Sequence, residues 1–253
     1  MINYIHEKAD IGVNARIGHF TVVNENVKIA DDVQVGHNVI IYPGTIIDQG
    51  VIVGDGAVIG KPLTVAATST VKSGQNLEPV RIKEKSIIGA LAVIYAGTVI
   101  GAYTLIGDQA SVREKCQIGD FVIIGRGVCL ENSVLIENYT KIQSGAYITA
   151  YTEIMGHVFV APMVTTANDN FMGRTRERFK YIKGPVIERG ARVGAGAILL
   201  PGIKVAEETF VAAGSVVTRD TGAKTLVKGI PARYEKNVPE EQLLWGTDRE
   251  DIE

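Results

Sequence analysis

A period of six residues runs through most of this chain of 253 residues and restricts it to a solenoid. Consecutive hexads cover residues 5–58, 88–165 and 187–216. The first position of each hexad is Ile, Val or Leu, and the fifth is small or β-branched, as at Ala9 and Thr21. Two inward positions in six cannot form one face of an α-helix, so the pattern predicts very short strands joined by turns. We expect three hexads to close one triangular coil.

The composition suits an aliphatic interior and gives no sign of a charged partner. Hydrophobic residues make up 46% of the chain and aromatic residues only 6%, so Val, Ile, Leu and Ala must fill the core. A net charge of -2 gives no basic field for nucleic acid or for an anionic membrane. With no apolar leader or membrane span, we expect a cytoplasmic protein. Cys116 and Cys129 fall within the repeats and are predicted to be buried free thiols.

The repeats resemble the left-handed β-helix of the hexapeptide-repeat acyltransferase superfamily. That resemblance alone implies the left hand, because parallel crossovers are otherwise right-handed. We therefore expect an all-β chain: a left-handed parallel β-helix over residues 1–217, with loop insertions at 61–85 and 167–185. A C-terminal extension over 218–253 follows, and its end reads as a short helix that caps the open edge of the solenoid.

The second loop predicts a site for an anionic group. A solenoid has flat sides, so a binding site needs loops that leave the coils or a neighbouring subunit. Arg174, Arg176 and Arg178 lie in this loop, and guanidinium groups match phosphate oxygens. They are candidates for a nucleotide-sugar diphosphate or a phosphate of coenzyme A. The alternative is a solvated loop whose cations pair with Glu177 and Glu188.

The central coils carry a finer resemblance. IQSGAY at 142–147 and TANDN at 166–170 resemble the active-site stretch of bacterial nucleotide-sugar N-acetyltransferases. The closest fit is to enzymes for dTDP-3-amino-3,6-dideoxyhexoses and UDP-2,3-diamino-type sugars, which supply lipopolysaccharide and S-layer glycans. The resemblance implies acetyl-CoA as co-substrate, a nucleotide amino sugar as acceptor and no metal. It also implies a homotrimer with active sites between subunits.

The end of the repeats carries a related signal. In hexapeptide acyltransferases, an ending similar to VAAGSVVTRD followed by VKGIPARY accompanies coenzyme A binding near the last coils. By this resemblance, Ala195 and Ala213 border the pantetheine path. Arg219, Lys228 and Arg233 are then candidates for the nucleotide phosphates of coenzyme A.

The expected chemistry lacks the usual histidine base. In the branch of the family with a catalytic histidine, the motif places that residue where this chain has Ala150. The other nearby candidate is His157, which follows Gly156 at a turn and remains an alternative base. We expect instead that a neutral sugar amine attacks the thioester directly.

Polar turn residues supply the remaining roles in this interpretation. Glu131 or Asn132 positions the amino sugar, and a backbone N–H beside Ser144 binds the thioester oxygen. The TANDN segment holds the sugar through Asn168, Asp169 and Asn170. Each of these residue types is also common in turns simply because it satisfies the backbone, which is the alternative for every one of them.

Three other functions share this fold pattern. A γ-type carbonic anhydrase needs three convergent histidines, and the four here are scattered: His6, His19, His37 and His157. An ice-binding solenoid needs a flat array of repeated Thr, which the mixed exposed positions do not supply. A pure scaffold is disfavoured by the cationic loops. Within the enzyme interpretation, the alternative acceptor is a non-sugar amine, such as an amino acid precursor.

Overall fold

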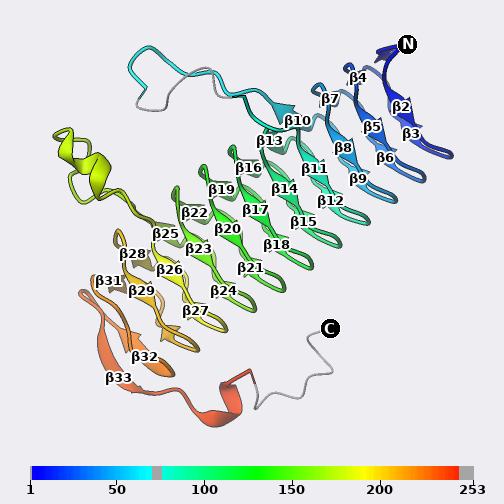
Figure 1. The fold of residues 1–253 in the computed structure, drawn as a ribbon. Helices are drawn as coiled ribbons and strands as arrows, with labels where there is room; N and C mark the ends of the chain where they lie inside the picture. Colours follow the sequence, from blue (N-terminus) through cyan, green and yellow to red (C-terminus); the bar gives the residue numbers. More distant parts are fainter. Residues whose placement is uncertain (1, 70–75, 245–253) are drawn as a thin grey trace.

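The protein is a left-handed parallel β-helix whose coils stack along one axis (Figure 1). This computed structural model describes residues 2–69 and 76–244. The strands form three sheets, here called A, B and C, with 11, 10 and 12 strands. From β1 to β31, paired strands lie three places apart in the chain, so one coil contributes one strand to each sheet. The predicted fold class is confirmed.

Almost every strand is only two residues long. Sheet A consists of β1 (Tyr4–Ile5), β4 (Val22–Val23), β7 (Ile40–Ile41), β10 (Val58–Lys61), β13 (Val93–Tyr95), β16 (Ser111–Val112), β19 (Cys129–Leu130), β22 (Tyr147–Ile148), β25 (Thr165–Thr166), β28 (Ile198–Leu199) and β31 (Val216–Val217). Sheet B consists of β2 (Asp10–Ile11), β5 (Lys28–Ile29), β8 (Ile46–Ile47), β11 (Arg81–Ile82), β14 (Val99–Ile100), β17 (Gln117–Ile118), β20 (Leu135–Ile136), β23 (Glu153–Ile154), β26 (Val186–Ile187) and β29 (Lys204–Val205). Sheet C consists of β3 (Arg16–Ile17), β6 (Gln34–Val35), β9 (Ile52–Val53), β12 (Ile87–Ile88), β15 (Leu105–Ile106), β18 (Ile123–Ile124), β21 (Lys141–Ile142), β24 (Phe159–Val160), β27 (Arg192–Val193), β30 (Phe210–Val211), β32 (Thr225–Lys228) and β33 (Arg233–Asn237).

The hexad pattern sets which side chains face inward. The second residue of a strand is the first position of a hexad and lies in the core, as Ile41 does. The fifth position, such as Val39, is also fully buried. Between strands the chain turns through a residue with positive φ, which is Gly44 at 72° in one coil and Asn38 at 56° in another. Glycine and asparagine tolerate this conformation, which explains their frequency in the turns.

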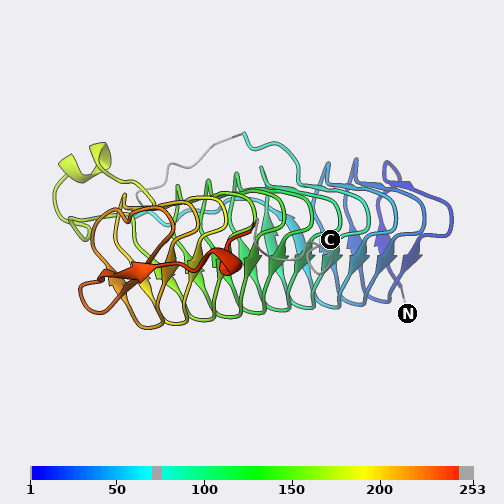
Figure 2. The ribbon, with the colours of Figure 1, turned by 90° about the horizontal axis from the view of Figure 1, so that it is seen from below.

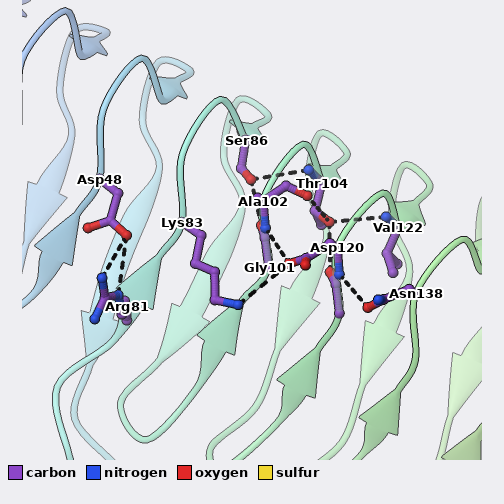
Figure 3. Close-up of polar contacts among 11 residues, drawn as sticks. Asp48, Arg81, Lys83, Ser86, Gly101, Ala102, Thr104, Asp120, Val122 and Asn138 are labelled. Carbon is purple, nitrogen blue, oxygen red and sulfur yellow. Dashed lines mark hydrogen bonds and ion pairs between the residues drawn. The ribbon is translucent and has the colours of Figure 1, made fainter.

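Buried hydroxyl groups link successive coils at the fifth position (Figure 3). Ser86 Oγ donates to the Gly101 carbonyl at 2.6 Å and accepts the Thr104 N–H at 3.1 Å. Thr104 Oγ1 repeats this arrangement one coil later, donating to Gly119 and accepting the Val122 N–H at 3.0 Å. These hydroxyls satisfy turn backbone groups that are shielded from water, and so add to the stability of the stack.

The substitution Thr104→Val is expected to destabilise the β-helix by about 1–3 kcal/mol. Valine has nearly the same shape, but it leaves the Val122 N–H and the Gly119 carbonyl without this partner. Urea unfolding followed by circular dichroism measures the loss. Thr225→Val is the matched control, because its hydroxyl bonds only locally and in an exposed position, to Gly222. Equal stability of the two variants would contradict the structural role of Thr104.

The first loop is shorter than predicted. The expected insertion at 61–85 contains β11, which pairs with β8 and β14, and Val80 and Ile82 are fully buried in the core. A single hexad beginning at Ile82 therefore returns to the coil before the long run at Ile88. The interpretation was wrong here because one isolated hexad gives no visible repetition in the sequence.

The C-terminal extension also differs from the expectation. Its only helical element in the described chain up to residue 244 is one 3-10 turn, η2 (Glu240–Gln242), where a short amphipathic helix was predicted from Pro239 onward. The rest of that segment, 245–253, lies outside the described residues. An antiparallel hairpin of β32 and β33 extends sheet C instead. No helix within residues 2–69 and 76–244 has the length and apolarity needed to cross a membrane.

The two cysteines have different environments. Cys116 occupies a fifth position and is buried, and desolvation raises the pKa of its thiol to about 12. Cys129 is exposed, which contradicts the prediction that both thiols are buried. The reason is the alternation of the strand: Cys129 is the first residue of β19, so its side chain points outward from sheet A while Leu130 points inward.

Candidate active site

Both loops leave the β-helix along one border, called here the A–B edge because its turns lead from sheet A to sheet B. The first loop follows β10 and returns at β11, and the second follows β25 and returns at β26. In Figures 1 and 2 both loops project from the same side of the coil stack. The second loop contains a short 3-10 helix, η1 (Glu177–Lys180). Any ligand held by loops is therefore held along this edge.

A cleft of about 430 Å³ lies on the A–B edge beside the second loop. The structure places five residues proposed from the sequence in its lining: Glu131, Asn132, Asn168, Asp169 and Arg178. Ala150, which stands where a family histidine was expected, lines the same cleft. Asn170 is exposed and does not contribute to this lining. The cleft therefore joins three successive turns of the A–B edge to the second loop.

Asp169 organises the second loop. Its carboxylate accepts the N–H groups of Phe171 at 2.8 Å and Gly173 at 3.0 Å, and forms an ion pair with Arg178 at 2.5 Å. The bond from the Gly173 amide is the main cause that lowers the pKa of Asp169 below its usual value; Phe171 and Arg178 act in the same direction. One side chain thus ties both halves of the loop together.

The cations of this loop divide into two groups. Arg178 is engaged by Asp169 and lies over the Phe179 ring, with its guanidinium carbon 4.5 Å from the ring centroid. Arg174 and Arg176 are exposed and form no ion pair among the described residues. The alternative pairing with Glu188 is not observed, since Glu188 contacts Lys204 at 3.5 Å. Arg178 therefore has a structural role, whereas the other two arginines are available for an anion.

A charged network lies behind the cleft. Arg113 donates through Nε and Nη2 to Glu114, at 2.8 and 3.1 Å, and through Nη1 to Glu131 at 3.3 Å. Glu114 is only 2% exposed, so its contact with Arg113 is what makes its burial tolerable. Tyr147 lines the same cleft as Glu131, and partial burial followed by the charge of this carboxylate raises the pKa of Tyr147. Sequence reasoning missed Arg113, Glu114 and Tyr147, which meet Glu131 only when coils stack.

A row of small residues follows another border, the C–A edge, where turns lead from sheet C to sheet A. Ser144, Ala195 and Ala213 occupy the same turn position in different coils, linked by backbone bonds such as Gly214 N–H to Ala195 O at 2.9 Å. At this position in an earlier coil, the His19 N–H donates to His37 Nδ1. The N–H groups of Ser144, Ala195 and Ala213 donate no hydrogen bond within the described chain. The row therefore presents free backbone donors.

Two of the three proposed phosphate ligands lie together. Arg219 and Arg233 line a cleft of about 330 Å³ at the C-terminal end of the β-helix. Lys228 is not part of this lining; its ammonium contacts Glu235 at 2.7 Å. The structure thus brings Arg219 and Arg233 together and separates Lys228 from them.

His157 lies on the third border, the B–C edge, where it stacks on Tyr139 with ring centroids 5.0 Å apart. It lines a separate open cleft of about 620 Å³ together with Glu137 and Arg189. Desolvation, followed by the charge of Arg189, lowers the pKa of His157. The structure does not bring His157 to Glu131 or Ser144. Within the described residues, no three His, Cys, Asp or Glu side chains are grouped to hold a metal ion.

Known proteins share the repeat over limited stretches. Residues 26–61 and 97–132 match the model of the bacterial transferase hexapeptide (six repeats). A 2,3,4,5-tetrahydropyridine-2,6-dicarboxylate N-acetyltransferase of Staphylococcus aureus is 42% identical over 57 residues, which cover 22% of this chain and only 24% of that enzyme. A galactoside O-acetyltransferase of Lactococcus lactis is 33% identical over 85 residues, covering 32% of this chain and 41% of that protein.

The whole fold has a counterpart among solved structures. A UDP-N-acetylglucosamine acyltransferase from Bacteroides fragilis aligns over 94% of this chain and 75% of its own, with a TM-score of 0.52 and 19% identity. At 19% identity, the similarity shows only that the two proteins share a fold. Together with the two matched stretches, it agrees with the three sheets and the turn pattern described above. The chain is thus a left-handed parallel β-helix, and two stretches of it match the hexapeptide repeat found in bacterial transferases.

Proposed function

We propose that this protein transfers an acetyl group from acetyl-CoA to the amine of a nucleotide-linked amino sugar of the dTDP-3-amino-3,6-dideoxyhexose type. One observation carries the proposal: free backbone donors line the C–A edge, and a carboxylate-containing cleft lies on the A–B edge. The outer face of sheet A separates these two borders. Acyl transfer needs donors for an oxyanion and a polar site for the nucleophile, and the two borders supply one each.

The thioester belongs to the C–A edge in this proposal. Its carbonyl oxygen accepts the Ser144 N–H, which is unpaired, whereas the neighbouring Gly145 N–H already donates to the Arg126 carbonyl at 3.0 Å. Ala195 and Ala213 continue the same row and leave room for an extended pantetheine chain. Arg219 and Arg233 lie beyond the last coils, where cationic side chains suit the phosphates of the nucleotide.

The amino sugar belongs to the cleft on the A–B edge. Glu131 accepts a hydrogen bond from the amine, and Asn132 and Asn168 bind hydroxyl groups of the sugar. Arg174 and Arg176 hold the diphosphate, since both are exposed and unpaired among the described residues. The amine enters in its neutral form and attacks directly, because the cleft has Ala150 where the family base was expected and His157 lies on another border.

A second copy of the chain completes the site. Within one chain, Ser144 and the acceptor cleft lie on opposite borders of sheet A, and a flat sheet has no concavity of its own. A neighbouring β-helix packed along this face forms the second wall of the channel. We propose the homotrimer that the family resemblance implies, with three equivalent channels.

A non-sugar amine is the second candidate acceptor. The Staphylococcus aureus enzyme named above acts, by its name, on a dicarboxylate, and it shares 42% identity with this chain over 57 residues. Arg174 and Arg176 suit carboxylates as well as phosphates. The two candidates therefore predict the same cationic loop and differ only in the body of the acceptor.

A panel of acceptors distinguishes the candidates. Purified protein is mixed with acetyl-CoA and either dTDP- or UDP-linked amino sugars or amino acid precursors, and the release of free thiol is followed. We expect turnover with a nucleotide amino sugar and none with amino acids. Turnover only with a dicarboxylate amine would overturn the sugar assignment, and no turnover with any amine would overturn N-acyl transfer.

A further inference from the structure

We propose that Tyr147 is a further catalytic residue, whose hydroxyl protonates the departing thiolate. Glu131 takes a proton from the attacking amine and then reprotonates Tyr147 with it. This inference rests on the proposed function. It adds a path for the proton, which the acyl transfer requires and which Ala150 cannot provide.

Tyr147 lies between the two borders of sheet A. Its backbone begins β22, directly after the turn that contains Ser144 and Gly145. Its side chain is on the outer face, 39% exposed, and lines the cleft on the A–B edge together with Glu131 and Thr149. Tyr147 therefore follows the turn of the oxyanion donor in the chain and lines the acceptor cleft, on the face where thioester and amine must meet.

Neighbouring side chains hold Glu131 in place at the cleft. Arg113 is fixed by two bonds to the buried Glu114, and its remaining Nη1 points to Glu131 at 3.3 Å. This contact holds the Glu131 carboxylate in the cleft that Tyr147 also lines. Burial and the adjacent carboxylate raise the pKa of Tyr147, so its hydroxyl keeps its proton at neutral pH and can act as the donor.

The proton count balances without any other group. The amine nitrogen forms a bond to the carbonyl carbon, and the π electrons move to the oxygen, which accepts the Ser144 N–H. When the carbonyl re-forms, the carbon–sulfur bond breaks and its electron pair leaves with sulfur. Glu131 takes the proton from nitrogen, Tyr147 gives its proton to sulfur, and Glu131 returns a proton to the phenolate. Amide and free thiol leave, and the protein is unchanged.

The test uses Tyr147→Phe in the full-length protein with two acyl donors. With acetyl-CoA, kcat should fall about tenfold, less than the roughly 10²–10⁴-fold typical of general acid–base catalysis, because a thiolate is a moderately good leaving group. With an acetyl aryl thioester, whose thiolate needs no protonation, the variant should match the wild type. Tyr4→Phe is the control, because Tyr4 is the corresponding outer residue of β1, at the other end of sheet A.

A second variant, Glu131→Gln, tests whether the activity loss comes from the proton relay or from disturbed packing. Its activity should fall with both donors, since the amine loses its proton acceptor whichever thiol departs. The relay is overturned if Tyr147→Phe keeps full activity with acetyl-CoA, or if its loss is equal with the aryl thioester. A wild-type protein that releases no thiol with any amine would instead overturn the proposed function itself.

Discussion

Replacing Ser144 by proline is expected to lower kcat by about a hundredfold or more, the effect of removing one donor from an oxyanion hole. The substitution deletes the single N–H that the proposed mechanism assigns to the thioester oxygen. Steady-state turnover with acetyl-CoA and the best acceptor measures the loss, and thermal unfolding checks that the variant is folded.

The backbone accepts proline at this position. Ser144 precedes Gly145, whose φ is 70°, and the Ala146 N–H donates back to the Gln143 carbonyl, which is the pattern of a type II turn. Proline is favoured at the second residue of such a turn, and Pro162 occupies the corresponding place one coil later. The loss should therefore fall on activity and leave the fold intact.

Ala90→Pro is the matched control for the Ser144 variant. Ala90 occupies the same turn position on the C–A edge, but its N–H donates to Asp108 Oδ1 at 2.8 Å. We expect it to cost a little stability and no activity. Ser144→Pro with kcat within twofold of the wild type would exclude this amide as the oxyanion donor.

The substitution Asp169→Asn is expected to loosen the second loop and to lower kcat/KM for the acceptor by about a hundredfold. The variant loses the charge that holds Arg178, and its amide group opposes one of the two N–H donors from Phe171 and Gly173. Hydrogen exchange of the peptide covering 167–185 should become at least about tenfold faster, because charge-assisted bonds that close the loop are lost. KM for acetyl-CoA should change little.

The pH dependence of the loop follows from the same carboxylate. The pKa of Asp169 is lowered in the folded loop. Its stabilisation of the loop is therefore fully present above the ordinary pKa near 3.8, and is lost as the pH falls through the lower pKa of the folded protein. The wild-type loop should stay protected from hydrogen exchange at neutral and mildly acidic pH.

Glu177→Gln is the control for Asp169→Asn, because Glu177 lies in the same loop without an ion pair among the described residues. Equal hydrogen exchange in the Asp169→Asn and Glu177→Gln variants would contradict the role of Asp169.

The sequence alone is enough to assign residues of the central coils to particular edges of the β-helix. Between residues 88 and 165 the repeat has no break, so counting hexads in threes places His157 on a different border from Glu131. The separation of His157 from the cleft beside the second loop is thus implicit in the spacing. The same count puts Cys129 at an outward position, which the prediction of two buried thiols overlooked.

The period of six by itself determined the strands, the aliphatic core and the position of the second loop, because each depends on residues close together in the chain. Only the tertiary structure decided which side chains lie together in the candidate site. Arg113, Glu131 and Tyr147 meet because stacking brings coils together, and Asp169 engages Arg178 because the loop folds back on itself. The unpaired Ser144 N–H depends on what the next coil offers, and a pattern within one hexad contains no record of that.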